Sequence, residues 1–287
     1  MKYLFKNRLA ENEMLLAEHK LICKPTHNDS RDYHPHYEIY FCNEHRNQSI
    51  TINGRTITMN TPNVIISAPF AIHSMLHAPG EDDHFERYIL FFSEHITTLF
   101  DDSLLSDAFL RKYSNCVFPL SDPDAENLSG LFDRILAPSA SLAEKLMLFG
   151  TFVATLDRMV PPGERILYGS TDHYIVNILR YIYLHLADDI SSESIAREFH
   201  ISRAKLDRDF RKFVGVSVHQ AVVNCRLSSA VDMLANTPLT IREIALHCGF
   251  ESEYYFYSFF KRNTGKTPTS IRNRKGKEDV KEPVKKA

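Results

Sequence analysis

The sequence predicts an α+β protein of two domains, a β-barrel or β-sandwich with appended helices followed by an all-helical domain. Three observations support this prediction. Short strand-like segments separated by turn residues fill residues 20–92. Apolar residues then recur at spacings of three and four, which is the period of a helix. Finally, one pattern occurs twice, roughly 50 residues apart, between Ser191 and Arg272, which indicates a duplicated structural unit.

The β region contains a hairpin signal. Ser49–Ile52 and Arg55–Thr58 flank Asn53-Gly54, a dipeptide that tolerates the positive φ angles of a tight two-residue turn. Further strand candidates surround this hairpin: His36–Phe41, Val64–Ile66 and Tyr88–Phe92. Several short strands of this kind favour a sandwich or a barrel.

Two amphipathic helices are expected in the next region, over Asp124–Leu136 and Leu142–Val160. A single apolar stripe on each helix fits either a cover for the β domain or contact with a second copy of the chain. Pro161-Pro162-Gly163-Glu164 then breaks the helical pattern, so we place the domain boundary near residue 165. The predicted domains are residues 1–165 and 166–275, followed by a basic tail, 276–287, that we expect to be disordered.

The repeated pattern begins with Ile-Ala in both copies, at Ile195 and Ile244, and ends in similar Phe-rich, basic segments. Each copy reads as a short helix, a tight turn and a second helix with one charged face. Ser202 and Ser252 are the expected N-caps of the second helices, and Thr240 with Glu243 forms a capping box. This arrangement is a helix-turn-helix, whose second helix enters the major groove of DNA.

One helix, Val218–Asn236, is predicted between the copies, after a helix over Asp172–Leu186 that precedes them. At 1.5 Å per residue the connecting helix is about 27 Å long. With its turns it could hold two recognition helices about one DNA turn, roughly 34 Å, apart. A single chain would then read two successive segments of the major groove.

On these residues the segment resembles the DNA-binding domain of the AraC/XylS family of bacterial transcription regulators. The resemblance covers about 100 residues and rests on several fixed spacings: Arg226-Leu227-x-x-Ala230, Ile244-Ala245, Gly249-Phe250, Phe256, Phe260-Lys261, Gly265-x-Thr267-Pro268 and Arg272. It implies two helix-turn-helix motifs joined by a linker helix. It also implies a homodimer that acts at a promoter, most often as an activator that recruits RNA polymerase.

By this resemblance, two sets of side chains face DNA. Residues at base-reading positions, or beside them, are Arg203, Ala204, Asp207 and Arg208 in the first copy, and Glu253, Tyr254, Tyr257 and Ser258 in the second. Phosphate contacts are expected from Lys205, Arg211, Lys212, Lys261, Arg262 and Lys266. Arg208 is the favoured base reader because a guanidinium can bond both acceptors of guanine. Many relatives carry Arg where Ser258 stands, so the first copy should carry more base readout.

The N-terminal half resembles the cupin-like effector domain of the same family. Alternation along one strand places four polar residues on one face, and two more residues complete the expected effector site: His34, His36, Glu38, Tyr40, His73 and Arg87. The resemblance implies a small-molecule effector, with a carbohydrate as the default. Metal binding and purely structural hydrogen bonding are the alternatives.

Departures from the cupin pattern argue against a metal. The family places its paired histidines four and six residues before the Glu, and those positions are His34 and Asp32 here, so His36 is out of register. Glycines expected on either side of the hairpin are also missing. We therefore expect no metal or other cofactor, and no catalytic residue, since no Ser-His-Asp, Cys-His or phosphate-loop arrangement is visible.

The distribution of charge along the chain agrees with a DNA-binding C-terminal half. Residues 171–287 contain 19 Lys and Arg against 14 Asp and Glu, whereas residues 1–170 contain 15 against 22. The basic half suits a polyanion partner such as double-stranded DNA.

The five cysteines form no CxxC pair, and no stretch has the length and apolarity of a signal core or a membrane span. We therefore expect a cytoplasmic regulator; a constitutive DNA binder without ligand and a metal-dependent cupin enzyme fused to a DNA-binding domain remain the alternatives.

Overall fold

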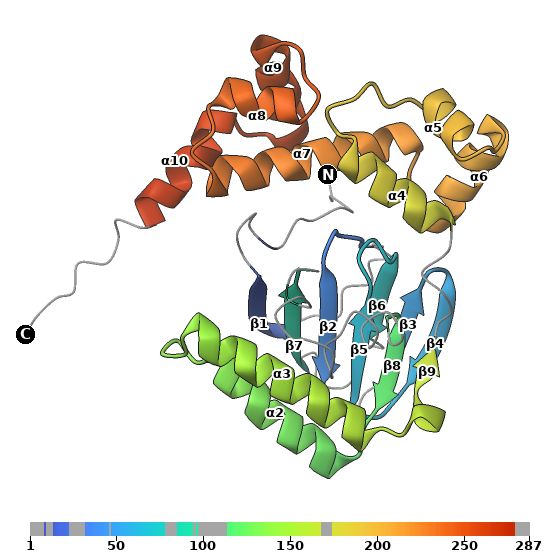
Figure 1. Cartoon of the computed structure of the whole chain (residues 1–287), viewed down its shortest axis with the longest axis vertical. Helices are drawn as coiled ribbons and strands as arrows, with labels where there is room; N and C mark the ends of the chain where they lie inside the picture. The colour runs from blue at the N-terminus through green and yellow to red at the C-terminus, as the bar shows by residue number, and fades with distance from the viewer. Residues whose placement is uncertain are drawn as a thin grey trace, which may run out of the picture. The chain divides into compact units, whose positions relative to one another are not determined.

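The computed structural model describes residues 9, 14–22, 32–45, 47–77, 85–93, 96, 114–167 and 174–278. They form two compact units that divide between Asn177 and Ile178, a β-rich unit and a helical unit (Figure 1). The predicted α+β fold class is confirmed. None of the helices within the described ranges is long and apolar enough to cross a membrane.

The β-rich unit contains two antiparallel sheets. The larger has the strand order β1-β7-β2-β5-β8-β9 and the smaller the order β4-β3-β6. The larger sheet consists of β1 (Leu15–Ile22), β2 (Tyr37–Cys42), β5 (Asn63–Ser67), β7 (Phe85–Phe92), β8 (Cys116–Pro119) and β9 (Ile166–Leu167). The smaller sheet consists of β3 (Gln48–Ile52), β4 (Arg55–Met59) and β6 (His73–His77).

The predicted hairpin is present between β3 and β4. Asn53 and Gly54 adopt φ angles of 49° and 82°, as a two-residue turn with two left-handed positions requires. The Asn53 side chain also accepts a hydrogen bond from the Ile72 backbone N–H at 3.0 Å. The turn therefore holds the segment that leads into β6 and carries His73.

Two helices, α2 (Asp122–Leu136) and α3 (Leu142–Met159), lie side by side against the larger sheet (Figure 1). Phe132 stacks on Phe41 at 5.6 Å between ring centroids, and Phe149 lies 4.8 Å from Phe92. These contacts bury the apolar stripes that the sequence places on the helices, so both helices cover the β unit. Leu142, at the start of α3, is an exception and remains exposed.

The β unit extends past the predicted boundary near residue 165. Pro162–Glu164 forms a short 3-10 helix, and β9 then pairs with β8. Buried Arg165 donates to the carbonyl of Val160 at 2.7 Å and pairs with Asp157 at 2.9 Å. The sequence break is thus a tight connection within the β unit, because these contacts attach the chain to α3.

The helical unit follows the predicted duplication closely. It contains α4 (Tyr174–Leu184), α5 (Ser192–Glu198), α6 (Arg203–Val214), α7 (Val218–Asn236), α8 (Ile241–His247), α9 (Glu253–Thr264) and α10 (Pro268–Glu278). The first helix-turn-helix is α5–α6 and the second is α8–α9. The helix α10 reaches Glu278, so the first residues of the predicted tail 276–287 are helical; residues 279–287 lie outside the described ranges.

Local signals explain where these helices begin and end. Ser202 accepts from the Lys205 N–H and Ser252 from the Tyr255 N–H, so both predicted N-caps are present. Gly215 and Gly265 end α6 and α9 at φ angles of 86° and 73°. The cysteines in the described ranges, Cys42, Cys116, Cys225 and Cys248, are buried thiols.

Candidate nucleic-acid interface and effector site

The recognition helices α6 and α9 each have one buried and one exposed face. Leu206, Phe210 and Val214 bury one face of α6, and Phe256, Phe259 and Phe260 bury the corresponding face of α9. Most of the predicted DNA-contacting residues are exposed on the opposite faces: Arg203, Ala204, Arg208, Arg211, Lys212, Glu253, Tyr254, Ser258, Lys261, Arg262 and Lys266. Lys205, Asp207 and Tyr257 are half-buried. Each copy therefore presents one polar surface above an apolar core, which is aromatic in α9.

Ion pairs tether the cations of α6. Asp209 accepts from Lys205 Nζ at 2.6 Å and from Arg208 Nε at 2.9 Å. Arg203 pairs with Glu193 and, at 3.5 Å, with Asp207. The Arg208 side chain is nevertheless 71% exposed. The pair of Arg203 with Glu193 is exposed on both sides, at 62% and 53%, and such pairs contribute only about 0–1 kcal/mol, so Arg203 can exchange this carboxylate for a phosphate or a base at little cost.

Asp209 is a residue that the sequence reading missed. Its side chain is only 13% exposed and holds two predicted DNA-contacting cations at once. The spacing in the sequence could have indicated this role, because Asp209 follows Lys205 by four residues, which places the two side chains next to each other on a helix. Asp209 also follows Arg208 directly. Asp209 thereby orients both side chains along α6.

The exposed face of α9 is aromatic rather than cationic in its first two turns. Tyr254 is 84% exposed, whereas the Tyr257 hydroxyl bonds the Thr269 hydroxyl of α10. The cations Lys261 and Arg262 lie in the last turn, and the Arg262 guanidinium lies 5.7 Å from the Phe259 ring centroid. This face differs in chemistry from that of α6, as the sequence predicts.

The predicted effector residues His34, Glu38 and His73 come together in the β unit. Backbone hydrogen bonds join Asp32 to His73, at 2.8 and 2.9 Å, and Phe70 to His34 at 2.7 Å. The same Glu38 oxygen then lies 2.8 Å from His34 Nε2 and 3.0 Å from His73 Nε2. All three side chains are buried. We call these three residues the His–Glu–His cluster.

Of the remaining predicted effector residues, His36 contacts the cluster, whereas Tyr40 and Arg87 lie farther along the same sheet. The His36 ring stacks on His34 at 6.2 Å, and burial lowers the pKa of His36 to about 3. Tyr40 is buried, and burial raises the pKa of its hydroxyl well above the usual value. Arg87 Nε is buried without a hydrogen-bond partner among the described residues, which leaves one donor for an anionic or hydroxyl-bearing ligand.

The two cluster histidines have different pKa shifts. Burial alone would lower the pKa of His73, but the charge and hydrogen bond of Glu38 raise it to about 9. At His34 burial dominates and lowers the pKa. Burial would raise the pKa of Glu38, but the charge of His73 and both histidine hydrogen bonds hold it well below the usual value. The cluster therefore carries one imidazolium, on His73, and one carboxylate.

A neutral His34 has one N–H for two acceptors. Its Nδ1 lies 3.0 Å from the His36 carbonyl and its Nε2 lies 2.8 Å from the Glu38 carboxylate. A divalent transition-metal ion bound to Nε2 would remove this conflict, and two imidazoles with one carboxylate are a suitable donor set. All three ligand atoms lie within 4.8 Å of one another. The cluster thus fits a metal ion better than the sequence predicts, because His34 and His73, rather than His36, flank Glu38.

Comparison with known proteins bears on the helical unit. A family model described as a helix-turn-helix domain matches residues 195–274. Residues 195–274 are therefore a helix-turn-helix domain. This confirms the resemblance read from Ile244-Ala245, Gly249-Phe250 and the other spacings.

Curated relatives match the same part of the chain. The xylose operon regulatory protein of Escherichia coli strain K12 is 32% identical over 121 residues, which are 40% of this chain and 31% of that protein. The HTH-type transcriptional activator RhaR of Salmonella dublin is 28% identical over 133 residues, 46% of this chain and 47% of that protein. The chain thus spans 31% and 47% of the length of these two relatives, a regulatory protein and a transcriptional activator.

Solved structures are also similar. ToxT from Vibrio cholerae strain SCE256 aligns over 92% of this chain and 98% of its own, at 14% identity and a TM-score of 0.49. The C-terminal domain of AraT, a response regulator from Geobacillus stearothermophilus, aligns over 37% of this chain and 88% of its own. That alignment has 27% identity and a TM-score of 0.35.

Proposed function

We propose that this protein is a sequence-specific DNA-binding transcription regulator whose β unit binds a small-molecule effector. The observation that carries the proposal is the pair of recognition helices, α6 and α9, joined by the linker helix α7 within one helical unit. Each is fixed by buried aromatic residues and presents polar side chains outward. At 19 residues, α7 is about 28 Å long, which suits two successive major-groove segments.

The direction of regulation and the partners are part of this proposal. The similarity to an HTH-type transcriptional activator supports activation. The proposed activator is a cytoplasmic homodimer that contacts RNA polymerase. The similarity to a xylose operon regulatory protein supports a carbohydrate effector. Buried Arg87 Nε and the His–Glu–His cluster supply the polar groups that such a ligand needs. The effector regulates DNA binding only if it binds one state of the protein better than the other.

Selection from random duplex DNA tests the proposal. We expect the full-length protein to enrich a site with two conserved segments about one helical turn apart. A thermal-shift screen of sugars and small acids then identifies the effector, because a bound ligand raises the melting temperature by mass action. Enrichment of no sequence would refute the DNA-reading proposal. Enrichment without any stabilising ligand would favour a constitutive DNA binder.

The His–Glu–His cluster favours one second candidate, a metal-dependent cupin enzyme fused to a DNA-binding domain. Metal analysis of the purified full-length protein distinguishes it. Stoichiometric iron, manganese or zinc that is lost in His34→Ala, but retained in a variant of exposed His45, would support this candidate. Absence of bound metal after incubation with each ion and gel filtration would exclude the cluster as a metal site.

A further inference from the structure

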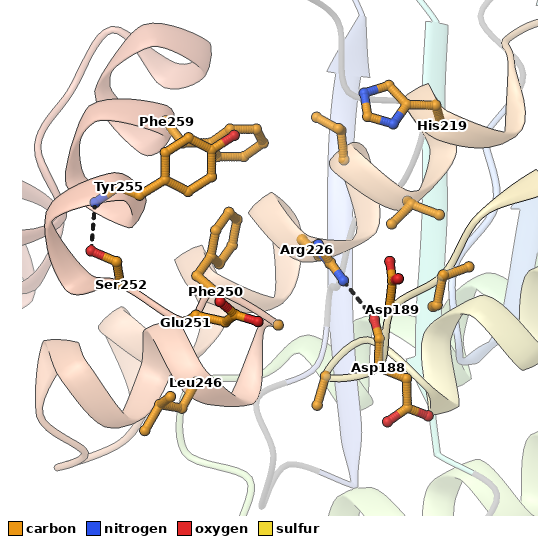
Figure 2. A pocket seen from close by; sticks show the side chains of 15 residues that line it. Asp188, Asp189, His219, Arg226, Leu246, Phe250, Glu251, Ser252, Tyr255 and Phe259 are labelled. Atoms are coloured by element: carbon orange, nitrogen blue, oxygen red, sulfur yellow. Dashed lines mark hydrogen bonds between the residues drawn. The ribbon is translucent and has the colours of Figure 1, made fainter.

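Arg226, on the linker helix α7, bonds to the chain segment that precedes the first helix-turn-helix. Its Nε donates to the Leu186 carbonyl at 3.1 Å, and its Nη2 donates to the Asp188 carbonyl at 2.9 Å (Figure 2). These carbonyls lie two and four residues past the end of α4 at Leu184. One planar guanidinium therefore holds two carbonyl groups of the 186–188 segment.

The same guanidinium contacts the turn of the second helix-turn-helix. It lies 5.7 Å from the ring centroid of buried Phe250. The preceding residue, Gly249, adopts a φ of 74° and packs directly against the contact. A Cβ at Gly249 would lie 2.3 Å from the Leu186 carbonyl oxygen and 2.6 Å from Arg226 Nη2. Glycine is required at this position by both the backbone conformation and the lack of space.

A groove of about 660 Å³ opens beside this contact. The 187–190 segment, α7 and the turn and start of α9 line it, and Arg226 lies between the two sides in Figure 2. The two motifs are thus joined by the long helix α7 and, across the groove, by the Arg226 guanidinium. We call the set Leu186, Asp188, Arg226, Gly249 and Phe250 the clasp.

We propose that the clasp fixes the orientation of the second helix-turn-helix relative to the first, and so sets the spacing between the two DNA segments that the protein reads. Arg226 is then a positioning residue that determines specificity without touching DNA. The consequence for DNA rests on the proposed function, whereas the geometric part stands on the contacts alone. Lysine cannot replace Arg226, because one ammonium group lacks the planar fork that bonds two carbonyls while stacking on Phe250.

The relative orientation of the two helix-turn-helix motifs matters for binding because the major groove turns around the DNA axis. One base pair adds about 3.4 Å and turns the groove by about 35°, so a recognition helix that tilts on α7 loses its register with the second segment. A rigid pair of motifs therefore accepts one spacing and rejects its neighbours. A pair without the clasp accepts several spacings, each more weakly.

A measurement without DNA tests the geometry. Spin labels at Glu198→Cys on α5 and His247→Cys on α8, in full-length protein with Cys23 changed to Ser, report the distance between the motifs. We expect one narrow distance distribution for the parent, and broader distributions for Arg226→Lys and Gly249→Ala. Two variants serve as matched controls. Gly265→Ala has nearly the same backbone, φ 73°, with nothing within 4 Å of its added Cβ, and Arg242→Ala removes an exposed arginine of α8.

A second measurement tests the consequence for DNA. On the site selected for the parent protein, we expect Arg226→Lys to lose about tenfold in affinity, and on either segment alone to stay within about twofold of the parent. Inserting one base pair between the segments should weaken the parent and the Arg242→Ala control strongly, but Arg226→Lys only slightly.

The outcomes separate the two proposals. Unchanged distance distributions in both folded clasp variants would overturn the clasp, and so would equal sensitivity of the parent and Arg226→Lys to spacing. If Arg226→Lys does not fold, as judged by helical circular dichroism, the comparison of Gly249→Ala with Gly265→Ala decides. If the parent binds no DNA sequence, the DNA-reading proposal fails, and the spin-label distances still decide the geometry.

Discussion

At the scale of single residues, Arg208 is the predicted base reader of the first motif. Its guanidinium donates through Nε to Asp209, and the side chain is 71% exposed. We expect Arg208→Ala to lose about 1–3 kcal/mol on the selected site and to relax preference at one base pair. Titration of single-base variants of the site by gel shift measures both effects. Equal losses on selected and scrambled DNA would make Arg208 a phosphate contact instead.

The His–Glu–His cluster makes a prediction about pH. The pKa of His73 is raised to about 9 in the folded state, above its unfolded value near 6.5, by Glu38 and, more weakly, by Asp32. This contribution to stability is complete below pH 6.5 and is lost as the pH rises through 9. We therefore expect the melting temperature of the β unit to fall between pH 6.5 and 9, beyond any change in the helical unit.

The variant Glu38→Gln tests the same cluster. Removing one partner of a buried charge pair should cost about 3–5 kcal/mol at pH 6.5 and abolish most of the pH dependence. The control is His19→Gln, since His19 and its partner Glu86 are both well exposed, at 39% and 44%. A melting temperature of Glu38→Gln that follows the parental pH profile would show that His73 is neutral in the folded protein.

At the scale of secondary-structure elements, the capping box of α8 predicts how much one N-cap stabilises the helical unit. Thr240 Oγ1 accepts from the Glu243 N–H at 3.2 Å, and Glu243 accepts from the Thr240 N–H at 2.7 Å. We expect Thr240→Ala to lower the unfolding free energy of the helical unit by about 1 kcal/mol, and Thr240→Ser to restore it. Chemical denaturation followed by circular dichroism measures this. Equal losses in both variants would assign the effect to the methyl group.

The elements that the sequence predicts well are those encoded by local signals. The bounds of α6 and α7 agree with the prediction because Ser202, Gly215 and Ser217 mark their ends within the chain itself. No strand was predicted at β1, β6, β8 or β9. The region that contains β8 was read as helical. Cys116–Pro119 is short, and it becomes a strand only by pairing with β5, about 50 residues earlier in the chain. Such long-range pairing leaves no periodic signal.

The candidate sites divide in the same way. The cupin-like resemblance, together with alternation along one strand, placed His34, Glu38 and His73 in one expected effector site. It did not predict that both histidines reach one carboxylate oxygen, since that depends on the backbone bonds between Asp32 and His73. The roles of Asp209 and Arg226 were likewise missed. Each depends on where a long side chain reaches, and sequence periodicity does not specify that.

At the scale of the whole molecule, charge is distributed unevenly, and this predicts how DNA affinity responds to salt. The helical half is basic and the β half acidic, so attraction to DNA comes from a limited set of cations rather than from net charge. The phosphate contacts proposed for Lys205, Arg211, Lys212, Lys261, Arg262 and Lys266 would release about 0.9 counterion each, giving a slope of log affinity against log salt of about −5.

Lys261→Ala should reduce the magnitude of this slope by about 1 and weaken binding to selected and scrambled DNA alike. Arg208→Ala should differ from Lys261→Ala, because it should weaken binding to the selected site more than binding to scrambled DNA. Fluorescence anisotropy over a range of salt concentrations measures the slope for each variant. A parental slope near −1 would mean that most of these cations make no phosphate contact, and that Lys205 keeps its pair with Asp209 when DNA is bound.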